Sequence, residues 1–78
     1  MERRSRKSQM PPEIIALGER INSIIKEKNL KTREVAHNAD MDVENLRKYI
    51  KGRQEMKVST MLKISKALEV SAKDLFPE

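Results

Sequence analysis

The segment 30–52, LKTREVAHNADMDVENLRKYIKG, constrains the fold of this chain more than any other part of the sequence. Apolar side chains recur at helical spacing near both of its ends, and Asp40-Met41-Asp42 between them is typical of a tight turn. We therefore expect two short helices, at about 32–38 and 43–51, that the turn brings together. Their buried sides are expected to carry Val35, Ala36 and Ala39 on the first helix and Leu46, Tyr49 and Ile50 on the second.

Apolar residues at spacings of three and four predict further helices on either side of this pair. One is expected from Pro12 or Glu13 to about Lys28, because proline is well tolerated in a first helical turn. Another is expected to open at 58–59, and a short last helix follows at about 71–76. The inward side chains are expected to be Ile14, Leu17, Ile21 and Ile24 in the first and Met61, Ile64 and Leu68 in the other. With no strand pattern, the fold class is all-α.

Residues suited to helix ends lie at the expected boundaries. Asn29 tolerates the left-handed backbone conformation and Gly52 adopts it freely, so each is expected just past a helix. Asp42 and Ser59 are expected to cap the starts of the helices that follow them. The run at 71–74, SAKD, has the form of a capping box and predicts the start of the last helix.

Composition excludes several classes of protein. At 78 residues the chain forms one domain with a small core. It has no cysteine and one histidine, His37, so we expect no disulfide framework and no metal site. No cofactor is expected either, and no small-molecule ligand, since the sequence indicates no second domain to sense one. No run of about 18 apolar residues is present, and the basic N-terminus lacks the apolar centre of a secretory signal. The expected compartment is therefore the cytoplasm.

Charge favours a polyanionic partner only weakly. The net charge is +5, but charged residues make up 37% of the chain with both signs mixed, which also describes an ordinary solvated surface. Residues 1–11 are basic and almost without apolar side chains, so we expect them to form a disordered arm. Residues 12–78 are expected to form the folded domain.

From Leu17 to Phe76 the chain resembles the phage-repressor and Cro-type helix-turn-helix family, also called the XRE family. The resemblance rests on LGERI at 17–21, Leu30, Val35-Ala36, Leu46, Gly52, MLKISKAL at 61–68, Val70-Ser71 and DLF at 74–76. These residues keep their order and spacing over about three quarters of the chain without an insertion. The resemblance implies a compact five-helix, lambda-repressor-like DNA-binding domain with a helix-turn-helix. The second helix of that motif is expected to lie in the major groove.

The resemblance also implies which residues contact double-stranded DNA. The expected base readers are Val43, Glu44, Asn45, Arg47 and Lys48. Lys48 can donate to guanine O6 and N7, Val43 can contact a thymine methyl, and Glu44 can accept from cytosine N4. A carboxylate also repels the DNA backbone, so a solvated role for Glu44 is the alternative. Phosphate contacts are expected from Thr32, Arg33, Lys51 and Arg53, and the arm is either a plain tail or a further segment that follows phosphates or the minor groove.

Three features depart from the family pattern. Asp40 stands where glycine is usual at the turn, although aspartate is among the few residues that visit positive φ. Thr32 replaces a glutamine that often contacts phosphate, and its hydroxyl reaches less far. Ile25 and Ile50 stand where relatives often carry an Arg–Glu ion pair, so an apolar contact is expected there instead. None of these departures changes the expected fold.

The leading functional hypothesis is a sequence-specific transcriptional regulator, most often a repressor in this family, that binds a palindromic operator as a homodimer. Leu75 and Phe76 are the expected dimer contacts, since exposed apolar patches mark interactions; the alternative is that both close the monomer core. Narrower versions are an antitoxin or a restriction–modification controller. A different class is a protein-interaction module that kept the fold and lost DNA binding, which the acidic turn and Glu44 favour. An enzyme is not expected, because no nucleophile–base pair or phosphate-binding glycine loop is present.

Overall fold

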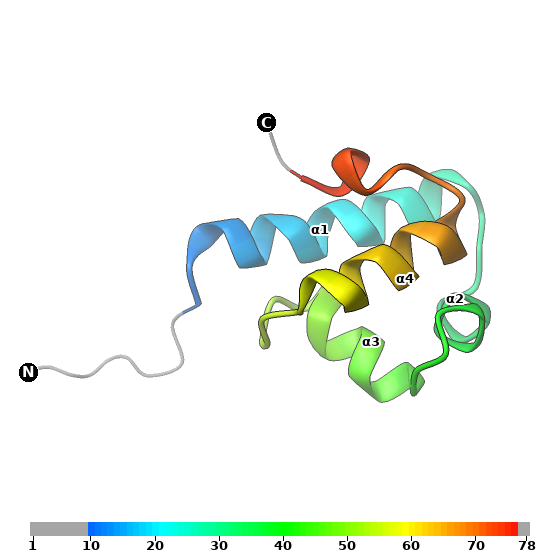
Figure 1. Ribbon diagram of the computed structural model, residues 1–78, viewed down its shortest axis with the longest axis horizontal. Coiled ribbons are helices and arrows are strands. Elements are labelled where there is room, and N and C mark those ends of the chain that lie inside the picture. The colour runs from blue at the N-terminus through cyan, green and yellow to red at the C-terminus, as the bar shows by residue number, and fades with distance from the viewer. Residues whose placement is uncertain (1–9, 77–78) are drawn as a thin grey trace, which may run out of the picture.

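The computed structural model describes residues 10–76, which form four α-helices and a 3₁₀ turn (Figure 1). In chain order these are α1 (Pro12–Glu27), α2 (Thr32–Asn38), α3 (Val43–Ile50), α4 (Val58–Leu68) and η2 (Ala72–Leu75). The all-α class is confirmed, as are the expected positions of the helices. The predicted basic arm, apart from its last two residues, lies outside the described part of the chain. None of the helices in the described part is long and apolar enough to cross a membrane.

The core lies where all five elements meet. α3 packs against α1 and α2, α2 also packs against α4, and η2 packs against both α4 and α1. The buried apolar side chains are Leu17, Ile21, Ile24, Ile25, Val35, Ala36, Ala39, Leu46, Met61, Ile64, Leu68 and Leu75. Because every helix contributes to this one cluster, no helix pair could be removed without exposing the others.

All four α-helices end in the same hydrogen-bonded motif. A residue with positive φ follows each helix: Asn29 (59°), Asp40 (59°), Gly52 (70°) and Glu69 (62°). The next N–H then donates to a carbonyl oxygen five residues earlier: Leu30 to Ile25 at 2.9 Å, and Met41 to Ala36, Arg53 to Lys48 and Val70 to Ser65 at 3.0 Å each. This Schellman motif satisfies carbonyl groups that a helix end leaves without partners. The left-handed backbone predicted at the first three of these positions is confirmed, whereas that of Glu69 was not foreseen.

The starts of the helices depart more from expectation. Asp42 precedes α3 as predicted, but its side chain makes no capping hydrogen bond. The prediction that Ser59 caps α4 is wrong, because the helix begins at Val58, two residues before the start that a Ser59 cap would give, and Lys57 holds the capping position. Ser71 and Asp74 do form the predicted capping box, in which the Ser71 N–H donates to Asp74 Oδ2 at 3.1 Å. A capping motif with two reciprocal partners was thus easier to predict than a single capping side chain.

Close backbone approach fixes the position of α3 against α1. A Cβ on Gly18 would lie 2.5 Å from the carbonyl oxygen of Ile50 and closer still to that of Tyr49. Only a glycine therefore lets the end of α3 come this near to α1. Ile25 is buried and Ile50 packs against the core, so apolar residues fill the positions where an ion pair was the family expectation.

The C-terminal turn is held to α1 and closes the core. Arg20 Nε on α1 donates to the Asp74 carbonyl oxygen at 2.9 Å. Lys28 Nζ, just past the end of α1, donates to the carbonyl oxygens of Leu68 at 2.8 Å and Glu69 at 3.3 Å. Leu75 is fully buried, so the prediction that it is exposed for dimer contact is wrong: η2 folds back onto α1 and α4 and inserts this side chain between them.

Candidate nucleic-acid interface

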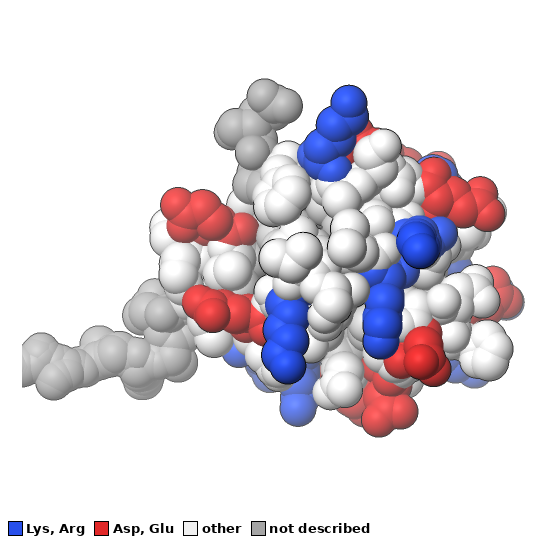
Figure 2. Space-filling model, viewed as in Figure 1, with Lys and Arg blue, Asp and Glu red and all other residues white. Residues whose placement is uncertain are grey.

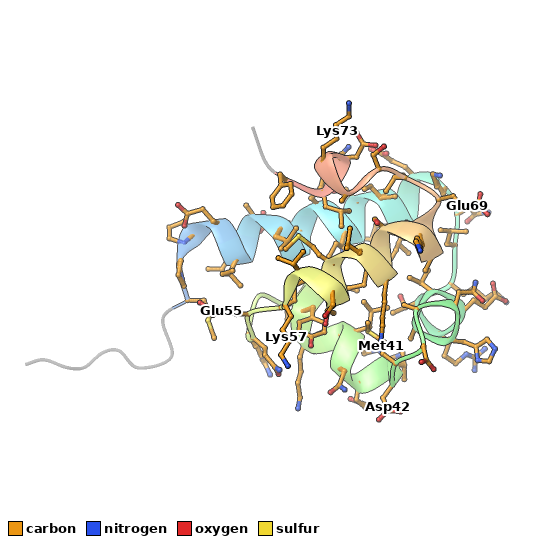
Figure 3. All side chains as sticks on the ribbon, viewed as in Figure 1. Met41, Asp42, Glu55, Lys57, Glu69 and Lys73 are labelled. Carbon is orange, nitrogen blue, oxygen red and sulfur yellow. The ribbon has the colours of Figure 1, made fainter. Side chains whose placement is uncertain are left out.

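The connection between α2 and α3 is short and held by the chain itself. Ala39 is buried, and Asp40 at positive φ reverses the chain direction. The N–H groups of Asp40 and Met41 both donate back to α2, at 3.0 Å from the oxygens of His37 and Ala36. Met41 packs against the core while Asp42 is exposed at the start of α3 (Figure 3). The direction in which α3 leaves α2 is therefore set by backbone bonds and one apolar anchor.

α3 separates its residues into a packed side and an exposed side. Leu46 is fully buried, and Tyr49 and Ile50 are half-buried, as predicted. Of the predicted base readers, Glu44, Asn45, Arg47 and Lys48 are exposed. Val43 is different: it is half-buried and packs against the core, since it lies three residues before Leu46 on the same side of the helix. The structure therefore brings four polar side chains together on one face and leaves Val43 at its edge.

The residues predicted to contact phosphate flank this face. Thr32 begins α2 and is half-buried, while Arg33 beside it is exposed. Lys51 and Arg53, both exposed, follow the end of α3. The other three helices place an apolar residue against the core at the position that Arg53 occupies after α3: Leu30, Met41 and Val70. At this one helix end, the Schellman motif instead holds the backbone of a basic residue in place at the surface.

Charge on the helix pair is mixed and partly paired. Residues 31–53 carry six Lys or Arg and four Asp or Glu side chains. On α3, Arg47 Nη1 lies 3.6 Å from Glu44 Oε2. Acidic and basic side chains are likewise interspersed on the face that Figure 2 shows. The interface therefore depends on where individual cations lie, because no uniform basic field covers it.

The outer side of α2 has a shallow hollow lined by Arg33, Glu34, His37 and Asn38. His37 is exposed there. Within residues 10–76, no three His, Asp or Glu side chains gather as metal ligands would. The hollow is lined by one helix alone, so it offers a surface for contact and not an enclosed ligand site.

Two short helices joined at a fixed turn, the second presenting an exposed polar and basic face, define a helix-turn-helix DNA-binding domain. Residues 20–77 match the Cro/C1-type HTH DNA-binding domain, and the chain belongs to this family. The family consists of DNA-binding transcriptional regulators and not of enzymes. The resemblance drawn from the sequence is thereby confirmed.

Solved structures of regulators share the fold. The restriction-modification controller protein C.AhdI from Aeromonas hydrophila superposes with a TM-score of 0.81 at 20% identity, over 85% of this chain and 100% of that one. The clp gene regulator ClgR from C. glutamicum gives 0.79 at 26% identity, over 83% and 84%. A hypothetical transcription factor, NHTF from Neisseria, gives 0.75 at 20% identity, over 91% and 90%. A comparison with curated proteins gave no match.

Two features of the surface were missed in the sequence. The first is the pairing of Glu44 with Arg47, although opposite charges three residues apart on a helix are a readable signal. The second is that Val58 and Leu62 on α4 remain 69% and 47% exposed. They lie four residues apart, and hence on one side of the helix. Apolar spacing alone does not distinguish such an exposed pair from a buried one.

Proposed function

We propose that this protein is a sequence-specific transcriptional repressor that binds a palindromic operator as a homodimer. The observation that supports it best is the exposed face of α3, where Asn45, Arg47 and Lys48 stand together with their backbone fixed by packing on the opposite side. An asparagine pairs with adenine, and arginine or lysine with guanine, in the major groove. We also propose that the protein acts in the cytoplasm, the compartment expected from the sequence.

The two sets of cations have different roles in this proposal. Lys48 and Arg47, on the exposed face of α3, read base edges and so discriminate between sequences. Arg33, Lys51 and Arg53 flank that face and bind phosphates, which positions the domain without reading sequence. Thr32 supplements them through its hydroxyl group. Val43 contributes only a contact at the edge of the groove, since part of its side chain packs against the core.

The homodimer is proposed to form through an apolar surface made of Val58, Leu62 and Phe76. Their side chains are 69%, 47% and 54% exposed. Phe76 directly follows η2, which packs against α4, the helix that carries the other two. Uncharged surface lies over α4 between basic side chains in Figure 2. Of the two predicted dimer residues, Phe76 therefore remains in the proposal and Leu75 does not.

In-vitro selection of binding sites from a random duplex library tests sequence-specific binding. The expected outcome is a consensus of two inverted half-sites whose centres are about 34–36 Å apart, since each protomer places one α3 in the groove. A library that yields no consensus after repeated rounds contradicts the proposal and favours a protein-interaction module.

The dimer is tested by sedimentation velocity on Leu62→Lys, with Asn38→Lys as the matched control. Both changes place the same charge on an exposed helical position, but Leu62 lies in the apolar surface and Asn38 lies on the outer side of α2. We expect Leu62→Lys to be monomeric and Asn38→Lys to dimerise like the unmodified protein. Equal behaviour of the two variants would mean that the dimer forms elsewhere.

The narrower roles remain subordinate to this proposal. A restriction–modification controller and an antitoxin would each use the same DNA-binding face. The similarity to C.AhdI, at 20% identity, shows the shared fold. The selected consensus, compared with the sequence upstream of the protein's own coding region, would separate autoregulation from control of other promoters.

A further inference from the structure

The exposed face of α3 carries one acidic side chain among its basic ones, and this side chain is paired. Glu44 Oε2 lies 3.6 Å from Arg47 Nη1, and their side chains are 79% and 49% exposed. The pair is therefore in water, on the face that meets DNA. Among the described residues it is the one ion pair within 4 Å, so no carboxylate in residues 10–76 holds Lys48 in the same way.

We propose that Glu44 is a specificity-determining residue that acts through Arg47. In the free protein and on non-cognate DNA, the Glu44 carboxylate stays paired with the Arg47 guanidinium group. The pair separates only where a base edge binds the guanidinium group in place of Glu44. Glu44 is in this sense a positioning residue and not itself a base reader. The inference rests on the proposed function, because it needs a protein that selects sequences.

The strength of the pair suits this role. An exposed pair three residues apart stabilises a helix by no more than about twofold in its equilibrium constant. A bidentate contact from arginine to guanine discriminates by about 5- to 150-fold, so a correct base displaces Glu44 readily. Binding of Arg47 to a single phosphate is less favourable than binding to guanine, because the unpaired Glu44 carboxylate then faces the negative DNA backbone. Glu44 thus lowers binding to every sequence, and lowers it most where no guanine is in place.

Non-specific binding is the process most affected, because it depends on how many phosphates the protein neutralises. While Arg47 is paired, the α3 face has one fewer cation for this purpose. Replacing Glu44 by glutamine releases Arg47 for any phosphate, which adds about one counterion per protomer to those released on binding. Each added contact steepens the log–log salt slope by about 0.9, so between 1 M and 0.1 M salt the affinity rises by roughly a further eightfold per protomer.

The test compares Glu44→Gln with Glu34→Gln. Glu34 is an exposed glutamate on α2, so its replacement changes the net charge equally without breaking an ion pair of the described residues. Binding to the selected duplex and to a random duplex of equal length is measured by fluorescence anisotropy over a series of salt concentrations. We expect Glu44→Gln to bind the random duplex several-fold tighter, with a salt slope steeper by about 0.9 per bound protomer, and the selected duplex with a smaller gain. The ratio of the two affinities therefore falls, whereas Glu34→Gln leaves it unchanged.

A second background shows whether the effect passes through Arg47. In Arg47→Met, adding Glu44→Gln should change random-duplex binding no more than Glu34→Gln does. The inference alone is overturned if Glu44→Gln weakens the selected duplex and leaves the random one unchanged, which identifies a direct base reader. It is also overturned if Glu44→Gln matches Glu34→Gln, or if its effect persists without Arg47. If the unmodified protein binds both duplexes equally, the proposed function fails first and this inference with it.

Discussion

Replacement of Gly18 by alanine should destabilise the protein, although the same change stabilises most helices. In a helix interior, alanine is favoured over glycine by about 1 kcal/mol. Here the new Cβ would lie 2.5 Å from the Ile50 carbonyl oxygen and would also meet that of Tyr49. Both are backbone atoms, so the clash can be relieved only if α1 and α3 move apart. Overpacking typically costs about 1–3 kcal/mol, and two backbone contacts this short put Gly18→Ala at about 3 kcal/mol, which outweighs the propensity gain.

We expect a net loss of about 2 kcal/mol for Gly18→Ala, equivalent to a fall in Tm of about 10 °C in a domain of this size. Thermal unfolding followed by circular dichroism, with urea unfolding as a second measurement, gives the free-energy difference. Ser23→Ala is the control, since Ser23 is exposed on α1 and its replacement should leave stability equal or slightly raised. If Gly18→Ala matched that control, α1 and α3 would not approach as closely as the structure shows, and the position of the DNA-binding face would rest on other contacts.

Three further predictions concern contacts, helix ends and DNA. Lys48→Ala should relax base preference at one operator position, whereas Arg53→Ala should weaken all sequences alike; a uniform loss for Lys48→Ala in a binding-site selection would contradict its assignment as a base reader. Glu69→Gly should raise stability by about 0.5–1 kcal/mol, because φ is 62° there and glycine adopts it without strain; an unchanged urea midpoint would argue against strain at this position. Lys28→Met should lower the free energy of unfolding by about 1 kcal/mol, because it removes the Lys28 Nζ donor, which lies 2.8 Å from the Leu68 carbonyl oxygen at the end of α4. Thermal unfolding at low and high salt would show whether the loss is electrostatic.

The C-terminal ends of the helices were the part of the fold that the sequence predicted best. Asn29, Asp40 and Gly52 each belong to the few residue types that adopt positive φ, and each takes that conformation after a helix. The left-handed backbone at Glu69 was not predictable in this way, because glutamate carries no such preference. There the tertiary structure decides: Val70 packs against the core and Lys28 binds the preceding carbonyl groups.

The packing of η2, the shortest element, was the hardest feature to predict from the sequence. Leu75 lies in a 3₁₀ turn of four residues, too short for apolar spacing to indicate an inward side. Its burial depends on how η2 returns to α1, which the Arg20 hydrogen bond to the Asp74 carbonyl oxygen helps to hold. For the DNA-binding face, the sequence pattern placed the polar residues of α3 correctly. It could not show that Val43 packs inward or that Glu44 holds Arg47, since both depend on side-chain positions.

The salt dependence of binding to selected and random duplexes tests the central claim, that α3 reads sequence while its flanking cations bind phosphate. Three cations per protomer are supplied by Arg33, Lys51 and Arg53. For a dimer, a plot of log affinity against log salt concentration should therefore have a slope of about −5 or steeper for both duplexes. The selected duplex should bind at least about a thousandfold more tightly at the same salt. Equal affinities for the two duplexes, or binding that does not respond to salt, would contradict the account.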